Sequence, residues 1–228
     1  MKRSLLLLVT GVLFCTQITS CTKLFEHDEE DPLAHLPNVE EESFSMSEMY
    51  DLCHCTRWAQ VGAFLEHEGY TTNSGDGALN RRWNKTADYQ CLGYYNFDSL
   101  KVVYSVYTGL WMAFGGHAEM YIYNINNQIA DKVITKKMNE IKTAVESEEI
   151  NSIKVTIGTS TNTYYSWDVA SNAFLSSWDP GNNYSGFFCK FKVVCSTHIY
   201  YMETSCLGDY SLGRGFNVMY GICNRNIM

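Results

Sequence analysis

The chain lacks several features that would name a function. Only 3 of its 228 residues are proline, and internal repeats and low-complexity segments are absent. Beyond the first twenty residues, no apolar run approaches the ~20 residues that a membrane-spanning helix needs. No basic patch is interleaved with aromatic side chains, and the formal net charge is −8. These absences predict a soluble body and argue against a nucleic-acid partner.

The first twenty residues have the pattern of a targeting segment. Lys2 and Arg3 give a positive start, and an apolar stretch runs from Leu5 to Phe14. This stretch is too short to cross a bilayer as a helix, but it suits a secretory signal peptide. We therefore expect residues 1–20 to be removed on export.

The residues behind the apolar stretch resemble the lipobox of bacterial lipoproteins. That motif places an aliphatic residue and two small residues before a cysteine, and the chain reads Ile18, Thr19, Ser20 and Cys21. The resemblance implies that Cys21 is acylated and becomes the N-terminus of a lipid-anchored protein. Ordinary cleavage near Ser20 is the alternative, but Ile18 stands where such cleavage prefers a small residue.

Residues 21–43 are expected to form an acidic, flexible tether. They hold two of the three prolines and two runs of Asp and Glu, so they cannot bury enough apolar surface to offset their ordering entropy. The order Cys21, Lys23 and then acidic residues is similar to the surface-export signal of Bacteroidetes lipoproteins, although a plain charged spacer explains it equally well. The expected location is the outer membrane or the cell surface, with a lipid anchor in the membrane.

Residues 44–228 are expected to form a globular α+β domain. The prediction is an N-terminal helix packed on an antiparallel sheet, followed by a β-rich C-terminal half, because aromatic residues favour strands. A boundary near residue 150 and one continuous sheet both fit the pattern. The predicted helices span residues 45–70 and 136–149. The predicted strands span residues 100–107, 117–123, 128–134, 152–158, 164–169, 187–195, 197–204 and 216–223. Loops or turns are predicted at residues 71–88, 124–127, 159–163 and 178–186.

The cysteines beyond Cys21 do not fix a disulfide pattern. An exported protein can form disulfides, but the number of these cysteines is odd, so at least one stays free or pairs between chains. The four nearest the C-terminus lie in strand-like sequence, and we expect them to be structural. The full set is Cys53, Cys55, Cys91, Cys189, Cys195, Cys206 and Cys223.

Three residues could form a catalytic site. Cys55 could begin a helix with the sequence CTRWAQVGAFLEHEGY, where free N–H groups and the helix dipole would stabilise a thiolate. His117 follows Gly115 and Gly116 at the start of a predicted strand. Asp131 lies in the predicted return strand, where it could orient the imidazole. This arrangement predicts a cysteine nucleophile, a histidine base and an aspartate that holds the base.

At these residues the chain resembles the NlpC-type cell-wall hydrolases, which are papain-like peptidases and amidases. The run DSLKVVYSVY is similar to the family's strand before its histidine, and GGHAEMYIYNINNQIADKV is similar to its histidine hairpin. The resemblance covers roughly residues 50–135. It implies that Cys55 is the nucleophile, His117 the base and Asp131 the orienting residue, with an amide bond in peptidoglycan or a peptide as substrate. The family has small residues after its cysteine where this chain has Thr56, Arg57 and Trp58.

Each of these residues also has a purely structural interpretation. Ser45 and Glu48 form a capping-box pattern, and a helix that begins there places Cys53 and Cys55 in its middle. His117 is then a turn residue and Asp131 a solvated side chain. Cys53 also competes with Cys55 for the nucleophile's role.

No metal ion or other cofactor is expected. Cys53, His54, Cys55 and His67 are the only nearby group of candidate ligands, but the pattern CHC lacks the two-residue gap of zinc ribbons. No second pair stands where it could complete four ligands.

The competing class is a surface lipoprotein that binds a glycan or a protein, including an immunity-type protein that blocks a toxin. Aromatic side chains in the second half could stack on sugars or form a protein interface, although they are equally expected in a β core. Asn182 and Asn183 lie in a loop that could hydrogen-bond a ligand. The aromatic residues are Tyr164, Tyr165, Trp167, Phe174, Trp178, Tyr184, Phe187 and Phe188.

Overall fold

The structure is a computed structural model of residues 1–228. It describes residues 39, 43–72, 80–95, 98–113, 116–178, 187–206 and 215–227. All of them lie in the compact unit that spans residues 36–228. The predicted signal peptide, the predicted lipidation site Cys21 and nearly all of the predicted tether lie outside the described residues.

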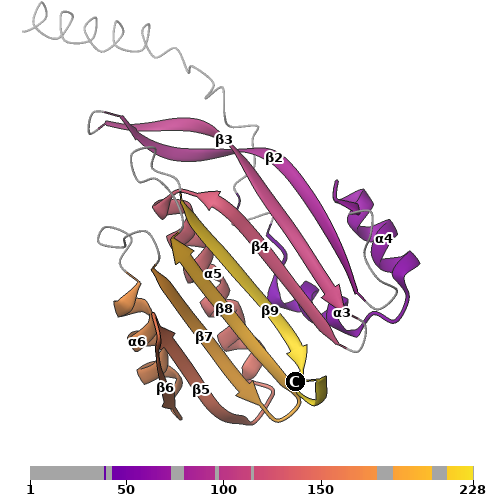
Figure 1. The fold of residues 1–228 in the computed structure, drawn as a ribbon, viewed down its shortest axis with the longest axis vertical. Coiled ribbons are helices and arrows are strands. Elements are labelled where there is room, and N and C mark those ends of the chain that lie inside the picture. The colour runs from indigo at the N-terminus through magenta and orange to yellow at the C-terminus, as the bar shows by residue number, and fades with distance from the viewer. Residues whose placement is uncertain are drawn as a thin grey trace, which may run out of the picture. The chain divides into compact units, whose positions relative to one another are not determined.

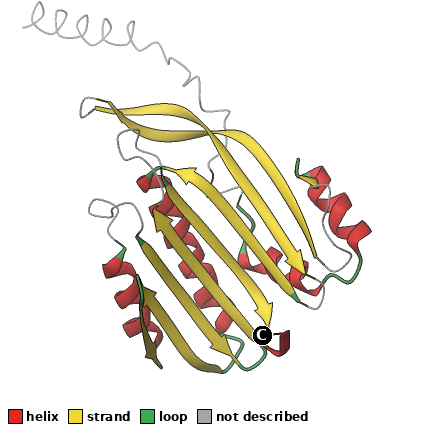
Figure 2. Ribbon diagram, viewed as in Figure 1, coloured by secondary structure: helices red, strands yellow, loops and turns green. Residues whose placement is uncertain are grey.

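The described part of the chain forms one antiparallel sheet with helices on it, as Figures 1 and 2 show. The sheet order is β1-β2-β3-β4-β9-β8-β7-β5-β6, and every neighbouring pair is antiparallel. Because β4 pairs with β9, strands from before and after residue 150 share this sheet. The strands are β1 (Thr71–Thr72), β2 (Asn80–Tyr95), β3 (Asp98–Ala113), β4 (His117–Ile125), β5 (Ile150–Ile157), β6 (Ser160–Tyr164), β7 (Phe188–Cys195), β8 (His198–Cys206) and β9 (Phe216–Asn224).

Helices α3, α5 and α6 pack on one face of the sheet, behind it in Figure 1. The strand residues that point to these helices form the main core, for example Met120 of β4 and Tyr220 of β9, which are both almost fully buried. The α+β prediction, with an N-terminal helix on an antiparallel sheet and a β-rich second half, is confirmed. The helices are α3 (Met46–His54), α4 (Trp58–His67), α5 (Asn127–Val145), α6 (Trp167–Ser177) and the 3-10 turn η2 (Arg225–Ile227).

The predicted helix over residues 45–70 is two helices with a break between them. The capping box starts α3, because the Ser45 side chain accepts from the Glu48 N–H and the Glu48 carboxylate accepts from the Ser45 N–H. Helix α3 ends at His54, and α4 begins at Trp58 without a side-chain cap. Gly69 follows α4 with φ of +82°, a conformation that glycine adopts at little cost.

The predicted hairpin at residues 124–127 and the predicted strand at 128–134 are wrong, because this segment begins helix α5. The Asn126 side chain accepts a hydrogen bond from the Ile129 N–H at 2.8 Å and so caps the helix. Ile129, Val133 and Ile141 are buried against the sheet at helical spacing. The sequence signal was therefore an N-cap and not a hairpin turn.

Three further predictions fail where local sequence did not show the packing. Residues 160–163, predicted as part of a turn, belong to strand β6. Residues 80–88 were predicted as loop but belong to the long strand β2. Residues 164–169 were predicted as one strand, but β6 ends at Tyr164 and α6 begins at Trp167. Trp167 and Phe174 lie on the same side of α6, and both rings pack edge-on against Phe191 of β7.

Candidate functional site

Cys55 does not begin a helix, contrary to the prediction. It is the C-cap of α3, and its N–H donates to the Leu52 carbonyl. Burial raises the pKa of its thiol, and the nearby Asp51 carboxylate raises it further. Cys53 is buried inside α3, where burial raises its pKa to about 12. Since the thiolate is the reactive form, neither cysteine has the surroundings of an activated nucleophile.

His117 begins a strand, as predicted, but its partners are different from those of a catalytic base. Its Nε2 lies 2.8 Å from the Tyr201 hydroxyl, which donates to Glu119 at 2.6 Å. The Trp111 ring packs edge-on against the imidazole, with 4.4 Å between ring centroids. The imidazole is thus fixed in a packed hydrogen-bonded chain on the sheet.

Asp131 is exposed and lies in the second turn of α5, not on a strand. His117 alternates with Ala118, which faces the helices, so the imidazole lies on the opposite face of the sheet from α3 and α5. No hydrogen bond, ion pair or ring contact of the described residues joins any two of Cys55, His117 and Asp131. The secondary structure assumed for Cys55 and Asp131 is therefore corrected, and the catalytic role of the three residues stays a prediction.

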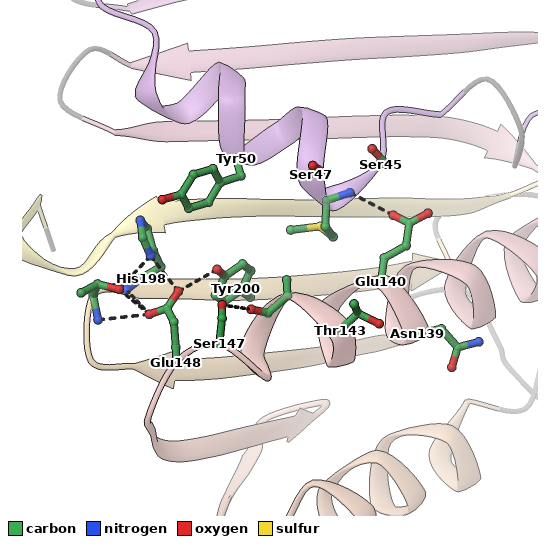
Figure 3. Close-up of a pocket in the computed structure, with 13 residues that line it drawn as sticks. Ser45, Ser47, Tyr50, Asn139, Glu140, Thr143, Ser147, Glu148, His198 and Tyr200 are labelled. Atoms are coloured by element: carbon green, nitrogen blue, oxygen red, sulfur yellow. Dashed lines mark hydrogen bonds and ion pairs between the residues drawn. The ribbon is translucent and has the colours of Figure 1, made fainter.

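A groove of about 730 Å³ lies between α3 and α5, with β8 beside it. Figure 3 shows its lining from both helices and from Tyr200 and His198 of β8. This volume is in the range of small-molecule sites. Most of the lining residues are polar by type, with two carboxylates and two tyrosines, although their exposed surface in the groove is more apolar than polar: Ser45, Met46, Ser47, Tyr50, Asn139, Glu140, Thr143, Ala144, Ser147, Glu148, Thr197, His198 and Tyr200.

At one end of the groove, Glu148 is held by a dense set of donors. Its carboxylate accepts from the Tyr200 hydroxyl at 2.7 Å, from His198 Nδ1 at 2.8 Å, and from the hydroxyl and N–H of Thr197. Burial acts to raise the pKa of Glu148, but these hydrogen bonds and the nearby imidazole outweigh it and lower the pKa from 4.5 to about 2. Glu148 is therefore a carboxylate at any physiological pH.

Three rings meet beside Glu148. His54, the last residue of α3, places its Nε2 3.3 Å from Nε2 of His198, the first residue of β8. Tyr50 lies one helical turn before His54 and packs on it, with 4.2 Å between ring centroids, and its centroid is 5.1 Å from that of His198. In Figure 3 the Tyr50 side chain points from α3 toward His198. Tyr50 is 40% exposed, so its ring is accessible from the groove.

At the other end, Glu140 is held by a buried lysine. Its carboxylate accepts from Lys137 Nζ and from the Met46 N–H, both at 3.0 Å. Lys137 Nζ also donates to the carbonyls of Ser43 and Phe44, and its side chain is fully buried. Burial lowers the pKa of Lys137, and the Glu140 carboxylate opposes that shift. These bonds attach the start of α3 to α5.

The residues of this groove were not found from the sequence. Glu148 is 50 positions from His198 and 52 from Tyr200, and His54 is 144 positions from His198. No local motif connects them. The weak signals were the capping box, which correctly predicts the start of α3, and the charged helix that ends near Glu148.

The structure bears differently on the candidate metal ligands and on the candidate aromatic binding residues of the sequence analysis. Within the described ranges, no group of three or more His, Cys, Asp and Glu side chains could hold a metal ion, so the group of Cys53, His54, Cys55 and His67 does not assemble. Of the described aromatic residues in that list, Phe174 and Trp178 are buried in the core, whereas Tyr164, Trp167 and Phe187 are partly buried and pack against it. Tyr165 is 82% exposed. Tyr184, Asn182 and Asn183 lie outside the described residues.

Comparisons with known proteins were made for the whole chain. No family model, no curated protein and no solved structure matches it. The similarity to NlpC-type hydrolases therefore remains a prediction. Among the described helices, none is both long and apolar enough to cross a membrane.

Proposed function

We propose that this protein is an exported lipoprotein, acylated at Cys21, whose domain binds a neutral glycan in the groove between α3 and α5. Its partners would then be the membrane that holds the lipid and a surface or cell-wall glycan. The observation that carries the proposal is the lining of the groove, which combines neutral hydroxyl and amide groups with the accessible ring of Tyr50.

The two carboxylates of the groove do not argue for a cationic ligand. The carboxylate oxygens of Glu140 and Glu148 accept from protein donors, as described above. Ser47, Asn139 and Thr143 line the groove and form no side-chain hydrogen bond within the described part of the chain. Hydroxyl and amide groups can both donate and accept, as sugar hydroxyls can. A polyhydroxylated ligand is therefore a better match than a lysine-rich peptide.

The exposed tyrosine supports the same class of ligand. An aromatic ring offers a flat apolar platform with a hydroxyl at its edge, and small-molecule sites combine such rings with a few placed polar groups. The cysteine-hydrolase alternative needs an activated thiol, and the raised pKa of Cys55 argues against one.

The binding test uses the purified mature chain and a panel of neutral oligosaccharides and peptidoglycan fragments, measured by calorimetry. We expect one glycan class to bind, and Tyr50→Ala to weaken it at least tenfold. Tyr165→Ala is the matched control, because Tyr165 is an exposed tyrosine that does not line the groove. Absence of binding to every glycan, or equal binding by both variants, would contradict the proposal.

The anchoring test is independent of ligand binding. In a bacterial host, Cys21→Ala should move the protein from the membrane fraction to the soluble exported fraction, because the acylated thiol is lost. Unchanged membrane association would show that Cys21 does not carry the anchor.

A further inference from the structure

The contact between His54 and His198 has an unusual hydrogen-bonding requirement. His54 Nδ1 lies 2.8 Å from the carbonyl oxygen of Tyr50. Since a carbonyl only accepts, Nδ1 must carry the hydrogen. His198 Nδ1 lies 2.8 Å from the ionised Glu148 carboxylate, so it also carries a hydrogen. A neutral imidazole with hydrogen on Nδ1 has a lone pair on Nε2.

The two Nε2 atoms therefore direct lone pairs at each other across 3.3 Å. Two lone pairs in this position repel unless a cation lies between them. The cation can be a proton shared by the two rings, or it can be a metal ion.

Two features of the pair match a metal site. Imidazole nitrogens bind Zn²⁺ at ~2.0–2.1 Å, and two of them on a tetrahedral ion are separated by roughly 3.3 Å. Histidines that bind metal almost always donate their other ring N–H to a carboxylate or a backbone carbonyl, which fixes the ring. The Glu148 carboxylate accepts this second N–H from His198, and the Tyr50 carbonyl accepts it from His54.

We propose that His54 and His198 bind one divalent transition-metal ion, with Zn²⁺ as the reference ion, through their Nε2 atoms. The described residues supply no third His, Cys, Asp or Glu ligand, so water or a bound ligand would fill the remaining positions. His198, Tyr50 and Glu148 line the groove, so the open positions would be reached from the groove. The ion would bridge α3 to β8. The inference does not depend on glycan binding.

The test is a calorimetric titration of the metal-stripped mature chain with Zn²⁺, compared with variants. We expect one equivalent to bind to the wild type and to raise its Tm, because a ligand that binds only the folded state stabilises it. His54→Ala should lower the affinity at least tenfold. Since His54 is exposed at the end of α3, this variant is expected to fold, and its circular dichroism checks that.

A matched control and a second readout keep the result specific. His67→Ala should bind Zn²⁺ like the wild type, because its side chain is 85% exposed and lies on α4, outside the pair. Glu148→Gln should weaken binding by roughly 10–100-fold, as loss of a ligand's supporting carboxylate does. Electron spin-echo spectroscopy of the Cu²⁺-loaded protein should detect two imidazoles in the wild type and one in His54→Ala.

Two outcomes would overturn the proposal. In the first, the wild type binds no stoichiometric Zn²⁺, so the pair holds a shared proton only. In the second, His54→Ala binds Zn²⁺ as tightly as the wild type, which would place the ion elsewhere, for example on a cysteine thiol. Neither outcome affects the glycan proposal, which is tested separately with Tyr50→Ala.

Discussion

The two ends of the groove each hold a carboxylate of the α5 region, but they do so with different chemistry. Glu140 is paired with a lysine that is fully buried and bonded to two backbone carbonyls. Glu148 is paired with a histidine whose other nitrogen faces a second histidine. The first arrangement uses every donor of the cation internally. In the second, the Nε2 atoms of His54 and His198 lie 3.3 Å apart, and the proposed metal site rests on this contact.

The comparison predicts that the Lys137 end contributes most to stability. Lys137→Ala would leave the Ser43 carbonyl without its donor, and the Phe44 carbonyl and the Glu140 carboxylate would each lose one of their donors. Breaking a buried pair from one side costs roughly 3–5 kcal/mol of unfolding free energy. Urea unfolding measures the loss.

Lys142→Ala is the control for that measurement, since Lys142 is exposed on the same helix. We expect its free energy of unfolding to change by less than about 0.5 kcal/mol. Equal losses in the two variants would remove the distinction between the two ends.

The Glu148 end should give stability that depends on pH. The folded-state pKa of Glu148 is lowered from 4.5 to about 2, so its contribution is fully present above pH 4.5 and is lost as pH falls toward 2. The contribution is on the order of 3 kcal/mol. Unfolding in urea with EDTA present, between pH 6 and pH 2, measures it.

Glu148→Gln is the comparison for the pH series. The variant should be less stable than the wild type at pH 6, and the two should converge near pH 2, because the amide cannot ionise. If the two curves stay parallel over that range, Glu148 does not carry the contribution.

Replacing one tyrosine at each end compares the stability contributed by a single hydrogen bond there. Tyr200→Phe removes a donor to the Glu148 carboxylate, and we expect a loss of roughly 1.5–3 kcal/mol, as for hydrogen bonds to charged groups. Tyr220→Phe removes a donor to the Phe44 carbonyl, which keeps its bond from Lys137, so the loss should be about 1 kcal/mol. A larger loss for Tyr220→Phe would contradict the assignment of a charged acceptor to the Glu148 end.

The smallest effect on ligand binding is expected for replacement of Cys55, which lies away from both ends of the groove. Cys55→Ser should leave glycan binding unchanged, and the native thiol should react with iodoacetamide more slowly at pH 7.5 than the thiols of the unfolded chain, because burial raises its pKa. Mass spectrometry of the labelled peptides measures both rates. Fast labelling of native Cys55, together with loss of peptidoglycan cleavage in Cys55→Ser, would favour the hydrolase hypothesis instead.

The sequence predicted the fold class because local patterns carry it. The alternating burial along β7 and the capping box at Ser45 report directly on a strand and on a helix start. It failed at residues 124–134, where asparagines that suit a hairpin turn also suit a helix N-cap. Only the burial of the α5 side chains against the sheet decides between the two.

The candidate site could not be predicted in the same way, because its residues come from distant parts of the chain. The sequence groups His54 with its neighbours Cys53 and Cys55 as candidate ligands, but Cys53 is buried in α3 and Cys55 lies just past the end of that helix. The actual partner of His54 is His198, which the antiparallel pairing of β8 with β9 brings under the end of α3. Pairings over this separation are set by topology and not by local pattern.

The most direct test of the difference between the two ends is a crystal structure of the mature protein grown with one equivalent of Zn²⁺, with anomalous data at the zinc edge. We expect one anomalous peak at ~2.0–2.1 Å from Nε2 of both His54 and His198, and none beside Lys137 and Glu140. If the two nitrogens stay 3.3 Å apart with no peak between them, the histidine end is as purely structural as the lysine end.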